Sequence, residues 1–142
     1  MPRPRYHAAV SLGLAALVAA RSRRWRDALP VLAAGVLVDL DHLVDLAVNR
    51  RAGRPAYVIL PLHAWEWVCG LLARRSRVTL GLAGGLVMHL TLDQLNPAIR
   101  HPLFYWLTVR AAHRFHAREP LVARERFRKG AKWMMEGPDR WF

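Results

Sequence analysis

The chain has 142 residues, 54% of them hydrophobic, which supports one folded domain with a single core and excludes an intrinsically disordered chain. Cys69 is the only cysteine, so an internal disulfide and a metal site built from several thiolates are both excluded. With 22 Lys and Arg residues against 10 Asp and Glu residues, the formal net charge is +12 and an anionic partner is expected.

The distribution of these charges favours a membrane surface over a nucleic acid. The basic residues cluster between apolar runs, in the segments 21–26, 50–54 and 74–77. Half of the acidic residues lie instead inside apolar segments, namely Asp39, Asp41, Asp45, Glu66 and Asp93. Basic loops around apolar helices are typical of proteins at an anionic membrane. A nucleic-acid partner is the weakest alternative, because the sequence has no recognised nucleic-acid-binding motif.

The hydrophobic pattern predicts an all-α fold, an up-down bundle of about four apolar helices followed by a basic amphipathic helical tail. Pro30 fits the first turn of the second helix, and Asn96-Pro97 ends the fourth. The expected helices cover residues 7–20, 28–48, 61–73, 78–95 and 107–117. We divide the chain into a helical domain, residues 1–109, and a tail, residues 110–142, that could lie on a membrane surface.

Two of the expected helices, 28–48 and 78–95, approach the length of about 20 residues that a bilayer span requires. The sequence therefore favours a membrane-embedded, multi-pass bundle. A soluble helical bundle with a core rich in Ala and Leu is the alternative.

Polar residues interrupt the helix expected over residues 28–48. Asp39, Asp41, His42 and Asp45 lie in an otherwise almost wholly apolar run, where an unpaired carboxylate would cost several kcal/mol. At about 100° per residue the four side chains fall within one arc of roughly 160°. A bound cation is the simplest way to offset such a cluster.

Three further apolar segments carry similar groups: His7 opens the first helix, His63 and Glu66 open the third, and His89 and Asp93 are one turn apart near the end of the fourth. In an up-down bundle all of these positions fall at the same end. At 1.5 Å per residue each lies within roughly 15 Å of that end. The pattern therefore predicts one shared site.

The residue types predict a divalent metal, with Zn²⁺ first and Mn²⁺ or Fe²⁺ as alternatives. Either two metals bind, or some carboxylates, Asp39 among them, orient the histidines instead. Asp45 and Glu66 are the candidate general bases for a metal-activated water. The candidate ligands are His7, Asp39, Asp41, His42, His63, His89 and Asp93.

Together these motifs resemble the YdjM-like family of membrane-bound metal-dependent hydrolases. The residues that carry the resemblance are His7, Asp39-Leu40-Asp41-His42, His63, His89-Leu90-Thr91-Leu92-Asp93 with Pro97, and the stretch Tyr105 to Arg110. It covers about residues 5 to 116 and implies an α-helical protein of a bacterial or archaeal inner (cytoplasmic) membrane, with a metal site and hydrolase activity. Many members carry a second histidine near the position of His63, where this chain has only Glu66 nearby.

The function predicted from the sequence is a membrane-bound metal-dependent hydrolase. Its expected substrates are esters or phosphoesters that are lipid-like or membrane-proximal, and its expected partners are anionic lipids. The alternative is a non-enzymatic membrane scaffold or regulator whose polar cluster is a structural network. On that interpretation His89 and Asp93 form a buried hydrogen-bonded pair, and Asp39 and Asp41 mark a break in the helix.

Overall fold

The computed structural model describes residues 4–52 and 56–123, and within them the protein is all-α. The described residues contain no β-strand, only isolated bridges joining Tyr57 to His116 and Ile99 to Val122. The elements are α1 (Pro4–Ser22), η1 (Trp25–Asp27), α2 (Ala28–Val36), η2 (Leu37–Asp41), α3 (His42–Arg51), α4 (Trp65–Arg74), α5 (Arg77–Gln94) and α6 (Leu107–Ala112), where η denotes a 3₁₀ helix.

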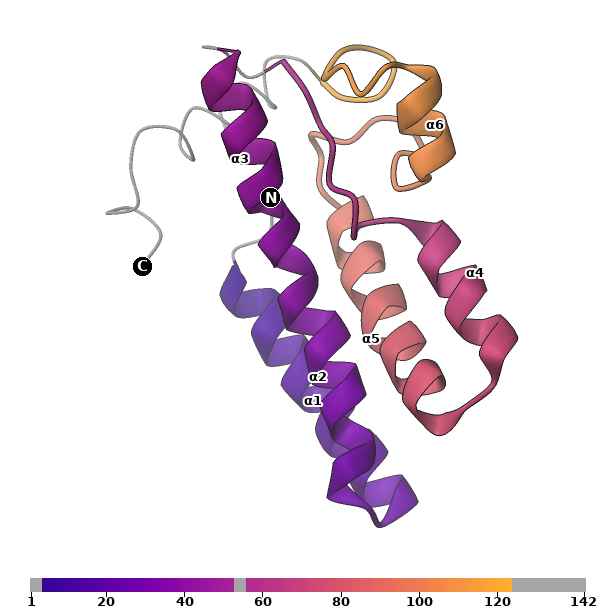
Figure 1. Ribbon diagram of the computed structural model, residues 1–142. Coiled ribbons are helices and arrows are strands. Elements are labelled where there is room, and N and C mark those ends of the chain that lie inside the picture. Colours follow the sequence, from indigo (N-terminus) through magenta and orange to yellow (C-terminus); the bar gives the residue numbers. More distant parts are fainter. Residues whose placement is uncertain (1–3, 53–55, 124–142) are drawn as a thin grey trace.

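The helices run up and down, as the short connections predict (Figure 1). Helix α1 descends, α2 and α3 ascend beside it, α4 descends, and α5 ascends. Helix α2 packs against both α1 and α5, and α4 packs on α5. The end of α5 and the segment before α4 therefore meet near the junction between α2 and α3.

Helices α2 and α5 approach closely because glycines face each other. A Cβ on Gly85 would overlap the carbonyl of Val31, and a Cβ on Gly35 would overlap the side chain of Ser11 on α1. Ser11 is fully buried at this point. Backbone contact thus fixes the distance between α2 and α5, and the small Ser11 side chain fixes the distance between α1 and α2.

The continuous helix predicted over residues 28–48 is wrong. The chain winds more tightly at Leu37–Asp41, so α2 and α3 are separated by a 3₁₀ turn. With three residues per turn, residues at i and i+3 eclipse each other, which places Asp39 and His42 on one side. Asp41 then turns into the core, where its exposed fraction is 3%. The break gives the two aspartates different surroundings.

Two other helix boundaries differ from the prediction. Helix α4 begins at Trp65 and not near residue 61, because the backbone N–H of Trp65 donates to the carbonyl of Tyr105 and the preceding residues form a turn. Helix α6 ends at Ala112 and not near 117, because Arg114 and Phe115 adopt positive φ angles of 52° and 56°.

The chain after α6 continues into the core up to Ala123. The core there includes the buried residues Ala117, Leu121, Val122 and Ala123. The part of the predicted basic tail that carries Phe127, Trp133, Trp141 and Phe142 lies outside the described residues. Among the residues that the structure does describe, none of the helices combines the length and the apolar character of a membrane span.

Candidate metal centre

Two fully buried imidazoles face each other at the centre of the polar cluster. The Nε2 atoms of His63 and His89 lie 3.0 Å apart. Oδ1 of Asp39 lies 3.6 Å from the His63 Nε2 and 3.3 Å from that of His89. Oδ2 of Asp93 lies 3.3 Å and 3.4 Å from the same two nitrogens. Four donor atoms from η2, α5 and the segment before α4 thus meet.

The five separations that involve the two imidazole nitrogens suit a tetrahedral metal ion, with both imidazoles and either carboxylate as ligands. Bonds of about 2.0–2.1 Å in a tetrahedral zinc site separate the donor atoms by about 3.3–3.4 Å. All five distances above lie within a few tenths of an ångström of that value. Asp39, His63 and His89 thus form a group that could hold a metal ion, and two more such groups adjoin it: His7 with His89 and Asp93, and Asp41 with His42 and His63.

The hydrogen-bonding of the two rings leaves their Nε2 lone pairs pointing at each other. Nδ1 of His89 donates to the carbonyl oxygen of Gly35 at 2.9 Å, so this nitrogen carries the hydrogen. Nδ1 of His63 is in ion-pair contact with Oδ1 of Asp41 at 2.9 Å, where the carboxylate also favours a protonated nitrogen. Two neutral rings would then repel each other across 3.0 Å. A proton or a metal cation must lie between them.

The charges of the cluster favour a cation there. Burial lowers the pKa of His63 and His89, but the carboxylates of Asp39 and Asp93 outweigh it, raising the His63 pKa well above its usual range and the His89 pKa to about 9. Burial raises the pKa of Asp39 and Asp93, but the surrounding imidazoles hold both carboxyls well below their usual range. A metal ion would therefore replace protons in the same space.

His7 joins the centre from α1. Its Nε2 lies 3.2 Å from Oδ1 of Asp93, and its ring stacks on that of His89 with centroids 4.2 Å apart. Asp93 therefore has one oxygen beside His7 and the other at the centre. The Nδ1 of His7 is buried without a hydrogen-bond partner.

His42 lies at the edge of the cluster that solvent reaches. Its Nε2 is 3.5 Å from Oδ1 of Asp39, and the Asp39 side chain, 30% exposed, is the most exposed group of the site. His42 and His63 each have a buried Nδ1, and Asp41 a buried Oδ1, that lack an aligned hydrogen-bond partner. This arrangement is compatible with both predicted alternatives, namely a second metal ion or carboxylates that orient the histidines.

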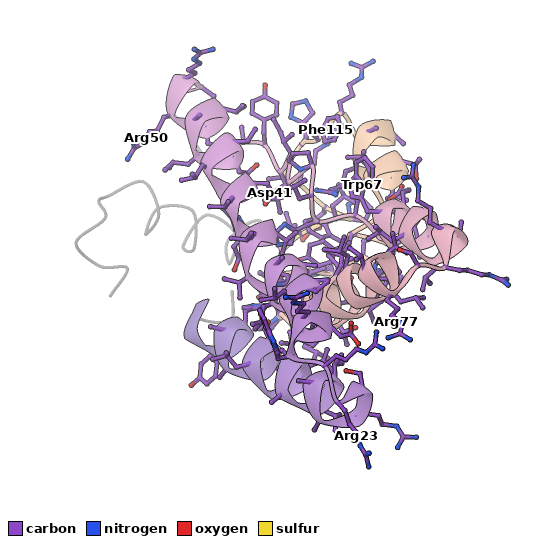
Figure 2. The ribbon with its side chains drawn as sticks, turned by 60° about the horizontal axis from the view of Figure 1, so that its bottom comes forward. Arg23, Asp41, Arg50, Trp67, Arg77 and Phe115 are labelled. Atoms are coloured by element: carbon purple, nitrogen blue, oxygen red, sulfur yellow. The ribbon has the colours of Figure 1, made fainter. Side chains whose placement is uncertain are left out.

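Asp41 and Asp45 belong to a buried polar stripe that binds a backbone segment. Asp41, Asp45 and Asn49 lie one turn apart and face the segment 56–63. Oδ2 of Asp41 accepts from the N–H groups of Leu62 and His63, and Oδ1 of Asp45 accepts from Ile59. Oδ1 of Asn49 accepts from the N–H groups of residues 56 and 57. Figure 2 shows Asp41 directed inwards, whereas Arg23, Arg50 and Arg77 project outwards.

The two predicted general bases have different surroundings. Burial raises the pKa of Asp45 to about 6, which suits a group that accepts a proton near neutral pH. Glu66 accepts hydrogen bonds at 3.0 Å from the N–H groups of Leu107 and Thr108 and from the hydroxyl of Thr108. Both oxygens of Glu66 therefore cap the start of α6.

Tyr105 and Arg110 bound the stretch that carries part of the family resemblance, but the sequence assigned neither of them a role at the site. Arg110 was assigned to the basic tail, yet its guanidinium is fully buried and donates to three backbone carbonyls. Tyr105 is buried with its ring 6.0 Å from that of His63. Burial, and then the charge of Asp93, raise the pKa of Tyr105 well above its usual range, so its hydroxyl remains a donor. In the sequence Arg110 looks like any other basic residue, and Tyr105 like a core aromatic.

Six of the seven candidate ligands are in contact with His63, His89 or Asp93, and the seventh, His42, contacts Asp39. Asp45 and Glu66 instead bind backbone groups.

Comparison of the chain with protein-family models, curated proteins and solved structures finds no match, so the candidate centre rests on its own geometry.

Proposed function

We propose that the protein is a metal-dependent hydrolase of ester or phosphoester bonds. The observation that carries the proposal is the pair of buried imidazoles whose Nε2 atoms lie 3.0 Å apart with two carboxylates beside them. His63, His89, Asp39 and Asp93 would hold the metal, as Zn²⁺ or alternatively Mn²⁺ or Fe²⁺. The resemblance to the YdjM-like family points to the same chemistry.

A divalent metal at such a site supplies Lewis acidity and lowers the pKa of a bound water. Around it, each residue has a separate task. Asp41 and the Gly35 carbonyl keep the hydrogens of His63 and His89 on Nδ1, which leaves both Nε2 atoms as ligands. Asp45 is the better candidate base, because its raised pKa suits proton transfer and Glu66 is engaged in capping α6.

A lipid-like substrate is supported by the surface around Asp39. Val36 and Leu43 lie three residues before and four residues after this carboxylate along the chain, and their exposed fractions are 40% and 57%. Leu37, Leu40 and Val44 on the same stretch are also exposed. Substrate would thus reach the most open ligand across an apolar surface, which suits an amphiphile with a polar ester group and an acyl chain.

Membrane association is the second part of the proposal. An open apolar groove of about 600 Å³ runs between α1 and α5, lined among others by Val10, Leu14, Leu17, Val87 and Met88. Basic residues follow α1 and α4, and the net charge of +12 favours an anionic surface. Co-sedimentation with anionic and with zwitterionic vesicles tests this part: we expect salt-sensitive binding to the anionic vesicles, and equal weak binding to both would contradict it.

The decisive experiment combines metal content with activity. Protein purified without chelator is analysed for transition metals and assayed with bis(p-nitrophenyl) phosphate, p-nitrophenyl esters and a short-chain phospholipid. We expect about one metal or more per chain and hydrolysis that chelator abolishes and metal restores. His89→Ala should lose both, whereas His113→Ala, outside the three His/Asp groups, should keep both. Trace metal in the wild type would contradict the proposal.

One observation favours the alternative of a non-enzymatic scaffold. The raised pKa of His63 and of His89 means that protons alone can balance the carboxylates of the cluster, which would then be a structural network. A scaffold predicts full stability in chelator and no hydrolysis of any ester. A chelator-induced fall in the melting temperature would count against it.

A further inference from the structure

We infer that Arg110 is a positioning residue for the metal centre: its guanidinium holds the backbone that presents His63. The inference rests on the proposed function, because it assumes that His63 binds a metal. It assigns to a basic residue of α6 a task that its place in the sequence does not suggest.

The segment that carries His63 has no regular secondary structure of its own. It runs from Ala56 to Ala64 between α3 and α4, mostly extended and then turning. Leu60 adopts a φ of 39°, a left-handed conformation that is unfavourable for a residue other than glycine. Such a backbone keeps its shape only where its surroundings impose it.

Side chains from two sides impose that shape. The N–H groups of Ile59, Leu62 and His63 donate to the aspartates of η2 and α3. The carbonyls are bound from the opposite side by Arg110. One of its terminal nitrogens donates to Ile59 O at 2.7 Å and to Leu60 O at 2.9 Å, and the other donates to His63 O at 2.6 Å. The segment is thus clamped between carboxylates and a guanidinium.

The clamp binds both backbone polar groups of His63. Its N–H donates to Asp41 at 3.2 Å and its carbonyl accepts from Arg110, while its Nδ1 lies 2.9 Å from the Asp41 carboxylate. Its Nε2 is then left to face His89 and the other donors of the centre. Because the strained Leu60 lies three residues before His63, releasing the carbonyls should let the imidazole move away from the other donors.

Two possible roles of Arg110, a planar guanidinium that bridges carbonyls and a simple positive charge, predict different effects of substitution. Arg110 also lies near the carboxylates of Asp41 and Asp45, whose charges act on its pKa. If Arg110 only balanced those charges, a lysine ammonium would replace it. If it acts by bridging carbonyls three residues apart, lysine should fail, because a single nitrogen cannot reproduce the fork.

The test compares Arg110→Lys and Arg110→Gln with the wild type and with Arg77→Lys, an exposed control on α5. Zn²⁺ affinity is measured by competition with a chromophoric chelator, and the geometry by the visible absorption of Co²⁺-loaded protein. Loss of an orienting partner typically weakens metal affinity about 10–100-fold. We expect a loss of that size in both Arg110 variants, with an altered Co²⁺ spectrum, helix content retained in circular dichroism, and no change in Arg77→Lys.

Three outcomes would contradict the inference, and they differ in what they say about the proposed function. Wild-type affinity and spectrum in Arg110→Lys, even with a lower melting temperature, would make Arg110 merely structural and overturn the inference while leaving the proposed function intact. A wild type that binds neither Zn²⁺ nor Co²⁺ would overturn both. If neither Arg110 variant folds at low temperature with Zn²⁺ present, Arg110 has a folding role and the inference also fails.

Discussion

The two histidines at the centre are held by two different kinds of structure. His89 lies on α5, where glycines bring α5 against the backbone of α2 and a helix carbonyl fixes the ring. His63 lies on an irregular segment whose backbone is bound by buried side chains. The first anchor depends on the close packing of two helices, and the second on charged and amide groups from three elements.

The two halves of the site should therefore tolerate different changes. Helix packing fails when volume is added, because a rigid backbone has nowhere to move. A side-chain clamp fails when one polar partner is removed and leaves the others buried without a bond. Substitutions at the two histidines, at the helix contact and in the clamp separate these two modes of failure.

Removing either central imidazole should weaken metal binding strongly. A structural zinc site of four ligands is worth about 10–16 kcal/mol, so one lost ligand costs about 3 kcal/mol, on the order of a hundredfold in affinity. We expect losses of at least that size for His63→Ala and His89→Ala in a chelator competition assay. If only one of the two variants lost affinity, the centre would not be shared between the halves.

Adding one methyl group at the helix contact should damage the half that carries His89. Gly85→Ala would force its Cβ against the Val31 carbonyl, and overpacking of this kind costs about 1–3 kcal/mol or more. The neighbouring Gly84 is the matched control, since a Cβ there meets nothing within 4 Å. Gly84→Ala should be neutral or stabilise by up to about 1 kcal/mol through helix propensity. Urea denaturation measures both, and equal effects would contradict the close contact.

Replacing Asp45 with a neutral residue should increase the free energy of unfolding, by an amount that depends on pH. Its pKa is raised from 3.8 to about 6 by burial, so its favourable contribution is complete below pH 3.8 and is lost as the pH rises through 6. Asp45→Asn keeps an oxygen for the Ile59 N–H without this loss. At pH 7 we expect the variant to be more stable by about 2–3 kcal/mol.

The control for this variant is its behaviour in acid. Near pH 4 its stability should approach that of the wild type, because Asp45 is then protonated in the folded protein. Denaturation curves of metal-free protein from pH 4 to 7 measure the difference. A gap that is constant over this range would contradict the raised pKa.

The smallest effect is expected at Glu66, outside both halves. Glu66→Gln weakens the cap of α6, which should cost about 0.5–1 kcal/mol in thermal unfolding. Metal affinity and hydrolysis should remain near wild type. A large fall in hydrolysis with unchanged stability would instead support the general-base role predicted for Glu66 from the sequence.

The sequence predicted the convergence at the centre because it depended on few assumptions. Apolar periodicity located α1 and α5, and short connections ordered them up and down. His7, His89 and Asp93 then had to lie at one end. These three are in contact, through a 3.2 Å pair and a stacked ring.

Other features could not be predicted because they depend on contacts far apart in the sequence. Periodicity alone does not distinguish a 3₁₀ turn from a continued α-helix, so the break at Leu37–Asp41 appeared only in the alternative interpretation. Asp41 was expected to bind the metal and Asp45 to act as general base. The backbone N–H groups from which both carboxylates accept lie on a segment with no periodic pattern, so these contacts could not be predicted. The role of Arg110 depends on carbonyls 47 to 51 positions earlier.

The turn at Leu37–Asp41 also has a bearing on protein engineering. In an uninterrupted α-helix the Gly35 carbonyl would accept from the N–H of residue 39, whereas here it accepts from the ring of His89. Substitutions chosen to regularise this stretch into one long helix would give this oxygen a second donor and would rotate Asp39 relative to His42, which the 3₁₀ turn keeps on one side. Gains in thermostability should therefore be sought outside residues 35–41.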